Sequence, residues 1–344
     1  MANLNPKLER LHLHCCGQMD SSVLQYWAQP TTFRSLTRLE LFAPYLVRAE
    51  AWHAFLSSKG PQLTGFLITN SPRFDEACML TMVEHCTKLE ELKLSEVGKL
   101  TDSWLKYLYQ LTLLRSLTLS RSAESLTDQP VVELLSMIGA RLEHLDLSGN
   151  DELTDVLLRD GIGQFCTSLQ HLALSGVTQL TDEGAAAFFD QWKQNEGESC
   201  IAKKTEDSMD VDPPITNRPL SSINLSQNPE LGTSALLALL QHSGSELLNL
   251  SINGWKSTEE KALNEFTKYA PKLQELDVGW CREVDDFVVG RFLGISHKDE
   301  DRRLAGCVNL KVLKVHGCNR VTSACPTRVS GLSSPYCARA DDIQ

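Results

Sequence analysis

A short leucine pattern recurs along this chain at nearly constant spacing. The pattern is L-x-x-L-x-L, with other apolar residues allowed at the leucine positions, and successive matches lie 25 to 28 residues apart except for two spacings of 51 and 37. The eleven matches begin at Leu8, Leu36, Leu63, Leu89, Leu114, Leu142, Leu169, Leu220, Leu247, Leu273 and Leu310. A period of this length is typical of leucine-rich repeats. We therefore predict an α/β leucine-rich-repeat solenoid of about eleven repeats.

Each unit combines a strand pattern with a helix pattern. In L-x-L the leucines alternate, so they point to one face of a short strand. The following stretch is amphipathic and helical in character, as in "LTDSWLKYLYQL" (100–111). One strand–helix unit cannot bury its apolar face alone, so stacked units share a continuous core. We expect a horseshoe over residues 1–325, with parallel strands on the concave face, helices on the convex face, and an irregular tail at 326–344.

Two recurring positions predict specific structural roles. The third residue after the last strand leucine is expected to point inward and to satisfy loop backbone groups, and it is Asn or Cys in five repeats: Cys16, Asn150, Asn228, Cys281 and Cys318. Other repeats place Pro44, Ser71, Val97, Ser122, Val177 and Trp255 there. A Leu-Thr-Asp motif follows in four repeats, at 100–102, 126–128, 153–155 and 180–182. Thr or Asp before an apolar-periodic run predicts a helix N-cap.

The two long spacings predict insertions. Residues 195–219 are polar and acidic and contain three prolines, which indicates a disordered loop between a helix and the next strand. A shorter insertion is expected at about 296–306. Only seven residues precede Leu8, and the repeat pattern decays after Leu310. We therefore expect that the ends continue in a longer architecture or are covered by a partner.

Composition and motifs exclude several function classes. The net charge of −11 argues against a broad basic surface for direct DNA binding. Eleven scattered cysteines indicate a reducing compartment rather than a disulfide framework. No secretory signal, membrane span, catalytic motif or zinc spacing is visible, and "HLHCC" (12–16) is not paired with a second ligand cluster. We predict a non-enzyme with no catalytic residues, cofactor, metal, membrane association or small-molecule substrate.

The strand positions between the leucines are the expected binding surface. They mix both signs of charge with small hydroxyl groups, which suits a protein or peptide ligand rather than DNA. Two tryptophans follow consecutive strands, where they either contact a partner or fill the core. The candidate partner-binding residues are Glu40, Phe42, Lys93, Thr118, Asp146, Asn224, Asp277, Lys314, Trp255 and Trp280.

Four stretches carry a resemblance to a known family. "LTRLELFAPYLVRAEAWHAFL" (36–56), "SPRFDEACMLTMVEHCTKLEELKLS" (71–95), "LEHLDLSGNDELTDVLL" (142–158) and "LTDEGAAAFFDQW" (180–192) resemble the repeat domain of the fungal Radiation-sensitive Seven family, the leucine-rich-repeat subunit of global-genome nucleotide excision repair. The resemblance implies a nuclear adaptor in DNA damage recognition. It also implies protein partners, namely a Snf2-type ATPase and elongin-C/cullin ubiquitin ligase components, with indirect DNA contact.

A second interpretation follows from the period near 27 with Cys at the inward position. This pattern resembles the cysteine-containing repeat class, which is common in substrate receptors of cullin-based ubiquitin ligases. The alternative is therefore an F-box-type substrate receptor of an SCF ligase that acts outside DNA repair. Such a receptor would also be compatible with a cytoplasmic location.

Overall fold

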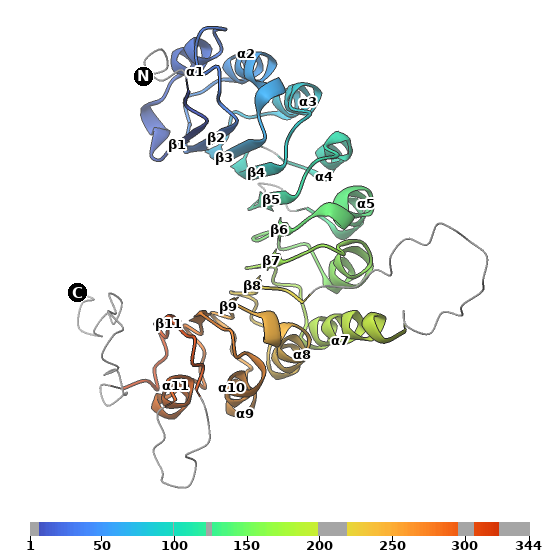
Figure 1. The fold of residues 1–344 in the computed structure, drawn as a ribbon, viewed down its shortest axis with the longest axis vertical. Coiled ribbons are helices and arrows are strands. Elements are labelled where there is room, and N and C mark those ends of the chain that lie inside the picture. The colour runs from blue at the N-terminus through green and yellow to red at the C-terminus, as the bar shows by residue number, and fades with distance from the viewer. Residues whose placement is uncertain (1–6, 99, 122–125, 199–218, 295–305, 323–344) are drawn as a thin grey trace, which may run out of the picture. The chain divides into compact units, whose positions relative to one another are not determined.

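The structure is a computed structural model of the chain, and it describes residues 7–98, 100–121, 126–198, 219–294 and 306–322. The chain divides into two compact units, residues 1–169 and 170–344, which are described in turn (Figure 1). Most of both predicted insertions, the predicted tail at 326–344 and the inward position at Ser122 lie outside the described residues. The single domain expected over 1–325 stays a prediction.

In the first unit, each strand is followed by helical structure. The strands are β1 (Arg10–Leu13), β2 (Arg38–Phe42), β3 (Gly65–Ser71), β4 (Glu91–Val97), β5 (Ser116–Ser120) and β6 (His144–Asp146). The α-helices are α1 (Ser21–Trp27), α2 (Ala49–Lys59), α3 (Glu76–His85), α4 (Asp102–Leu105), α5 (Asp128–Ile138) and α6 (Gly163–Phe165). Short 3-10 helices are η1 (Cys16–Gln18), η2 (Gly60–Gln62), η3 (Lys106–Gln110) and η4 (Gly139–Arg141), and η5 (Leu157–Ile162) is a π-helix.

The second unit repeats this order. Its strands are β7 (His171–Ala173), β8 (Ser222–Asn224), β9 (Asn249–Ser251), β10 (Glu275–Asp277) and β11 (Val312–Lys314). Its helices are α7 (Asp182–Glu198), α8 (Thr233–Ser243), α9 (Glu260–Asn264), α10 (Phe266–Tyr269), α11 (Asp286–Phe292) and the 3-10 helix η6 (Gly244–Glu246). Among the described residues, no helix combines the length and apolar character that a membrane crossing requires.

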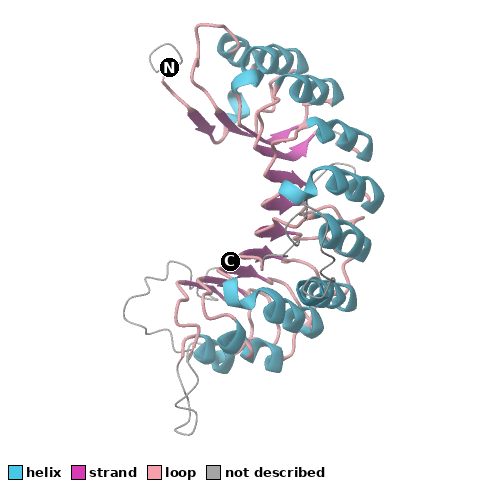
Figure 2. Ribbon diagram, turned by 45° about the vertical axis from the view of Figure 1, so that its right-hand side comes forward, coloured by secondary structure: helices cyan, strands magenta, loops and turns pink. Residues whose placement is uncertain are grey.

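The strands pair in chain order, and the described pairs are parallel. Within each unit the helices lie on one side of the sheet (Figure 2). The leucine positions fall in register and are buried, as in the row Leu39, Phe66, Leu92, Leu117 and Leu145. Stacking therefore buries the apolar face that a single repeat would leave in water. The predicted leucine-rich-repeat solenoid of eleven strand-bearing repeats is confirmed.

The inward position satisfies strand-end carbonyl groups, as predicted. The Asn150 Nδ2 atom donates to the carbonyls of Leu147 and Leu119, which lie in its own and in the preceding repeat, at 2.8 Å each. The Cys281 thiol donates to the Ile252 carbonyl of the preceding repeat at 3.4 Å. Because a buried carbonyl without a donor costs about 1–3 kcal/mol, these side chains stabilise both repeats that they join.

Trp255 takes the same role with a different side chain. Its indole nitrogen donates to the Leu225 carbonyl of the preceding repeat at 2.7 Å, and its ring is fully buried. The core alternative therefore holds for Trp255, and its proposed partner contact is wrong because no part of the ring reaches the surface.

The Leu-Thr-Asp motif acts differently from the prediction in part of the chain. Thr101 and Thr127 make no side-chain cap hydrogen bond to their helices. Instead, the Asp102 carboxylate accepts from the backbone N–H and hydroxyl of Thr127, the threonine of the motif in the next repeat. Asp128 accepts from Thr154 in the same way, at 2.9 and 2.6 Å. The aspartate is thus a clamp between consecutive repeats.

Predicted capping by the motif threonine does occur in two repeats. Thr154 Oγ1 accepts from the Val156 backbone N–H at 3.2 Å, and Thr181 Oγ1 accepts from that of Gly184 at 3.0 Å. The motif therefore combines two functions, one within a repeat and one between repeats.

Candidate functional site

The candidate site is the strand face, defined as the side of the sheet that is turned away from the helices. Within each unit, the predicted columns are in register. Glu40, Leu67, Lys93, Thr118 and Asp146 pair in sequence across β2 to β6. In the second unit the same column runs through Ala173, Asn224, Ser251, Asp277 and Lys314.

A third column on this face was missed from the sequence. It contains the residue that precedes the second pattern leucine, as in Arg38, Gly65 and Glu91. The alternation of strand side chains carries the signal, because residues two apart share a face. Position 38 therefore belongs beside Glu40.

In the first unit, this third column forms a charged network. The Arg38 guanidinium donates from Nε to Glu91 at 2.7 Å and from Nη1 to Glu40 at 2.9 Å. Its hydrogen bonds with Glu91 raise the pKa of Arg38 above its usual value. The side chain crosses the intervening strand at Gly65, where a Cβ atom would lie only 2.7 Å from Arg38 Cγ. Glycine at this place is what allows β2 and β4 to exchange an ion pair over β3.

The edge of this network reaches β1. His12 Nδ1 lies 3.0 Å from Glu40, and His12 Nε2 lies 2.6 Å from His14 Nε2. The His14 ring in turn approaches the ring of Phe42, with centroids 5.9 Å apart. The Glu40 carboxylate is thus paired with Arg38 and His12 on the sheet. Phe42, in contrast, is 41% exposed and presents an apolar surface.

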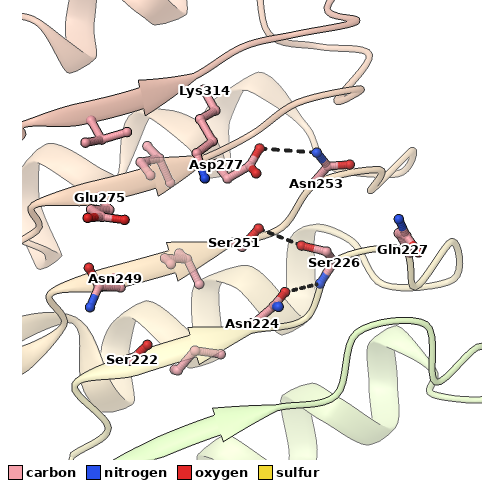
Figure 3. Close-up of a pocket in the computed structure, with 14 residues that line it drawn as sticks. Ser222, Asn224, Ser226, Gln227, Asn249, Ser251, Asn253, Glu275, Asp277 and Lys314 are labelled. Atoms are coloured by element: carbon pink, nitrogen blue, oxygen red, sulfur yellow. Dashed lines mark hydrogen bonds between the residues drawn. The ribbon is translucent and has the colours of Figure 1, made fainter. Parts of the chain in front are cut away.

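In the second unit, polar side chains line an open pocket of about 380 Å³ over β8 to β11 (Figure 3). The labelled lining side chains are serine, asparagine, glutamine, two carboxylates and one lysine. Ser226 and Ser251 share a hydrogen bond of 2.6 Å between their hydroxyl groups. Lys314 is exposed at the β11 side, in register with Asp277. This chemistry suits hydrogen bonding to a polypeptide backbone and polar side chains.

Three predicted residues use one oxygen for local backbone bonds. Asp146 Oδ1 accepts from the Ser148 N–H at 2.9 Å, Asn224 Oδ1 from that of Ser226 at 3.1 Å, and Asp277 Oδ1 from that of Gly279 at 3.0 Å. Each residue closes the end of its own strand. A partner would therefore meet side chains that are already oriented by the fold.

Beside the pocket, two side chains again meet across a glycine of the intervening repeat. Asn253 Nδ2 donates to Asp277 at 3.2 Å and lies 2.9 Å from His316 Nε2, across the intervening Gly279. A Cβ atom at Gly279 would lie 2.6 Å from His316 Cε1, so only glycine leaves room for this contact. Because an amide nitrogen only donates, His316 Nε2 is the acceptor in this hydrogen bond. His316 was not among the predicted candidates.

Trp280 follows β10 and is a largely exposed aromatic side chain. It is 61% exposed, and it adopts a left-handed φ of 57°. Its ring lies against Gly317, where an added Cβ would come within 2.3 Å of Cδ2. The indole therefore packs against Gly317, and most of the side chain remains exposed to solvent.

The predicted candidates thus separate by exposure. Phe42, Lys314 and Trp280 are exposed, and Glu40, Lys93, Asp146, Asn224 and Asp277 are partly exposed. Thr118 is only 6% exposed, so its proposed role in partner contact is wrong, as it is for Trp255. Thr118 pairs with Lys93 on β4 and with Asp146 on β6.

Comparisons with known proteins agree with this architecture. A model of the leucine-rich-repeat family matches residues 142–156 and 165–189. The DNA repair protein rhp7 of Schizosaccharomyces pombe is 31% identical over 293 residues, which are 85% of this chain and 48% of that protein. The DNA repair protein RAD7 of Saccharomyces cerevisiae is 26% identical over 336 residues, which are 95% of this chain and 53% of that protein.

A solved structure supports the same assignment. The crystal structure of the Rad7 and Elc1 complex in yeast matches with a TM-score of 0.71 and 25% identity, over 95% of this chain and 74% of that one. The chain spans about half the length of the curated relatives it matches. By its repeats and by these similarities, the chain is a leucine-rich-repeat protein that is similar over most of its length to the DNA repair proteins rhp7 and RAD7.

Proposed function

We propose that this chain is the repeat domain of a non-enzymatic adaptor in nucleotide excision repair. The observation that carries the proposal is its similarity to two DNA repair proteins over 85% and 95% of its length. The neighbouring solved structure is a complex with Elc1, an elongin C, which supports an elongin-C and cullin ligase component as one partner. A Snf2-type ATPase is the second proposed partner, and the protein acts in the nucleus.

The strand face is the proposed site of protein contact. Its exposed residues offer an aromatic ring at Trp280, a cation at Lys314 and an apolar edge at Phe42. Aromatic residues are enriched among those that dominate binding energy, and dispersed charges set partner choice more than affinity. Glu40, Lys93 and Asp146 belong to the proposed surface of the first unit, and Asn224 and Asp277 belong to that of the second unit. DNA contact is indirect, through the partners.

Affinity purification of the complete protein from its native cells tests the functional class. The expected result is co-purification of a Snf2-type ATPase together with elongin C and a cullin, identified by mass spectrometry. Recovery of Skp1 and a cullin without any ATPase would contradict the repair adaptor and support the F-box alternative. The purification is repeated after ultraviolet irradiation, since a damage-recognition complex should then be enriched on chromatin.

Surface variants test whether the strand face carries the contact. Trp280→Ala and Lys314→Glu should each weaken recovery of the ATPase, because they remove an exposed ring and reverse an exposed charge. Lys261→Glu is the matched control, since Lys261 is exposed on the helix side of the same unit. If the control weakens recovery as much as both strand-face variants do, the strand face is not the contact surface.

A further inference from the structure

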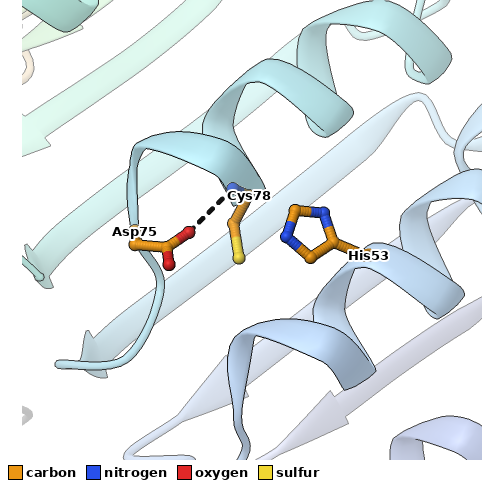
Figure 4. A group of neighbouring side chains, drawn as sticks. All are labelled: His53, Asp75 and Cys78. Atoms are coloured by element: carbon orange, nitrogen blue, oxygen red, sulfur yellow. Dashed lines mark hydrogen bonds between the residues drawn. The ribbon is translucent and has the colours of Figure 1, made fainter.

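Three side chains of different chemistry meet between two helices of the first unit. His53 lies on α2, Asp75 is the N-cap of α3, and Cys78 lies in the first turn of α3 (Figure 4). One ligand atom from each residue lies within 4.8 Å of the other two. His53 is 22 residues from Asp75 in the sequence, so no short metal motif marks the group. The three side chains meet because the second repeat stacks on the third.

Hydrogen bonding fixes which nitrogen of His53 faces the group. Nδ1 lies 2.6 Å from the Thr81 hydroxyl, and that hydroxyl donates its own proton to the Ala77 carbonyl at 3.0 Å. Because the hydroxyl has one proton, Nδ1–H must be the donor toward Thr81. The other ring nitrogen, Nε2, is left to face Asp75 and Cys78 (Figure 4). A second hydrogen bond that orients the imidazole in this way is characteristic of metal-binding histidines.

The other two residues also keep ligand capacity. Asp75 uses Oδ1 to accept from the Cys78 backbone N–H at 2.9 Å. The Cys78 thiol lies 3.7 Å from the Ala49 carbonyl and also interacts with the Asp75 carboxylate. Thus a nitrogen, an oxygen and a sulfur atom converge within 4.8 Å of one another.

We propose that His53, Asp75 and Cys78 form a zinc site that ties α2 to α3. A set of imidazole, carboxylate and thiolate ligands suits Zn²⁺, whereas Ca²⁺ and Mg²⁺ prefer oxygen ligands alone. Tetrahedral zinc needs ligand atoms roughly 3.3–3.8 Å apart. The three atoms already lie within 4.8 Å of one another, so small side-chain rotations, including that of the exposed Asp75, bring them to this separation. Water fills the fourth position.

Binding must displace one proton. The thiol gives Cys–SH + Zn²⁺ → Cys–S–Zn⁺ + H⁺. Burial raises the pKa of the Cys78 thiol to about 12, and the carboxylates of Asp75 and Glu50 contribute to the rise. A cation reverses this unfavourable charge environment.

Metal titration of the full chain tests the site. The protein is stripped with a chelator, kept reduced with a phosphine, and titrated with Zn²⁺ against a chromophoric competitor. Co²⁺ is used in parallel, because a thiolate ligand adds a charge-transfer band in the near ultraviolet. The expected result is one Zn²⁺ equivalent that Cys78→Ala lacks and that Cys86→Ala retains. Cys86 is the matched control, since it is a buried thiol at the end of the same helix.

Two further variants separate metal binding from folding. His53→Gln should lose the same equivalent without removing a buried apolar side chain. Thr81→Val keeps the shape but removes the acceptor for Nδ1–H, so the affinity should fall about 10- to 100-fold. Circular dichroism in chelator establishes that each variant is folded. Equal Zn²⁺ affinity and stoichiometry in the wild type and His53→Gln, or a Co²⁺ complex without the thiolate band, would overturn the proposal.

Discussion

At the scale of one residue, Gly65 has no side chain, and this allows two charged residues on either side of it to form an ion pair. Arg38 and Glu91 lie on strands that do not neighbour each other, and they pair only because nothing stands on Gly65 between them. An added Cβ would meet Arg38 Cγ at 2.7 Å and Glu91 Oε2 at 3.3 Å. The position is therefore restricted by contact rather than by backbone conformation.

We expect Gly65→Ala to destabilise the chain by about 1–3 kcal/mol, the usual cost of overpacking. At an open position, Gly→Ala instead stabilises by about 0.4–1 kcal/mol through the unfolded state. Gly17→Ala is the control, because its Cβ would meet Tyr45 only at an ordinary 3.7 Å. Urea denaturation of both variants measures the difference. Equal stability of the two variants would show that Arg38 adjusts without cost.

Trp255 and Trp280 show how one position decides the role of a side chain. Trp255 is the third residue after the last apolar strand residue, Ile252, and this position points inward in every repeat that places Asn or Cys there. Trp280 is the second residue after Val278, and it points outward. Counting from the strand therefore predicts both environments, whereas residue type alone predicts neither.

At the scale of elements, the aspartate clamps join one helix start to the next. We expect Asp128→Asn to cost about 1–2 kcal/mol, since an amide replaces one of the two acceptors used by Thr154. Thr154→Val should add little in the Asp128→Asn background, because both changes break the same contact. Asp190→Asn, at an exposed site on α7, is the control and should change stability by no more than about 0.5 kcal/mol. Additive effects in the double-mutant cycle would contradict the clamp.

Buried thiols at helix ends predict a pH dependence of stability. Burial raises the pKa of Cys86 from 9.0 to about 12. The unfolded chain thus loses this proton at lower pH than the folded chain does. The contribution to stability is complete below pH 9 and is lost as pH rises toward 12.

Cys86→Ala should therefore lose less stability than the wild type between pH 9 and 12. Chemical denaturation at several pH values measures this, and the difference between the two proteins cancels the titration of all other groups. Cys15→Ala is the control, because Cys15 is exposed. An identical pH slope for the wild type and Cys86→Ala would contradict the prediction.

At the scale of the whole molecule, charge predicts weak contact with DNA. The net charge is −11, and the strand face alternates cations with carboxylates, as at Arg38 and Glu91. We expect the isolated chain to bind duplex DNA more weakly than about 1 μM at physiological salt, with further loss as salt rises. Fluorescence anisotropy with undamaged and ultraviolet-damaged duplexes measures this. Nanomolar binding that resists salt would contradict an indirect role on DNA.

The sequence by itself determined the repeat, the fold class, the inward Asn and Cys positions and the two strand-face columns. These features depend on local periodicity, because a leucine that is buried in one repeat is buried in the next. The similarity to the DNA repair proteins was also visible in the sequence stretches 36–56 and 142–158. The burial of Thr118 could not be predicted from the sequence, because its exposure depends on neighbours from other repeats.

Only the tertiary structure decided which distant residues meet. The clamp from Asp128 to Thr154 spans 26 positions, and the ion pair from Arg38 to Glu91 spans 53. The group of His53, Asp75 and Cys78 likewise draws on two repeats. Such contacts depend on the register and spacing of stacked units, which a periodic pattern leaves open. The repeated residues therefore specify the solenoid, and the stacking of repeats decides which polar and charged side chains meet.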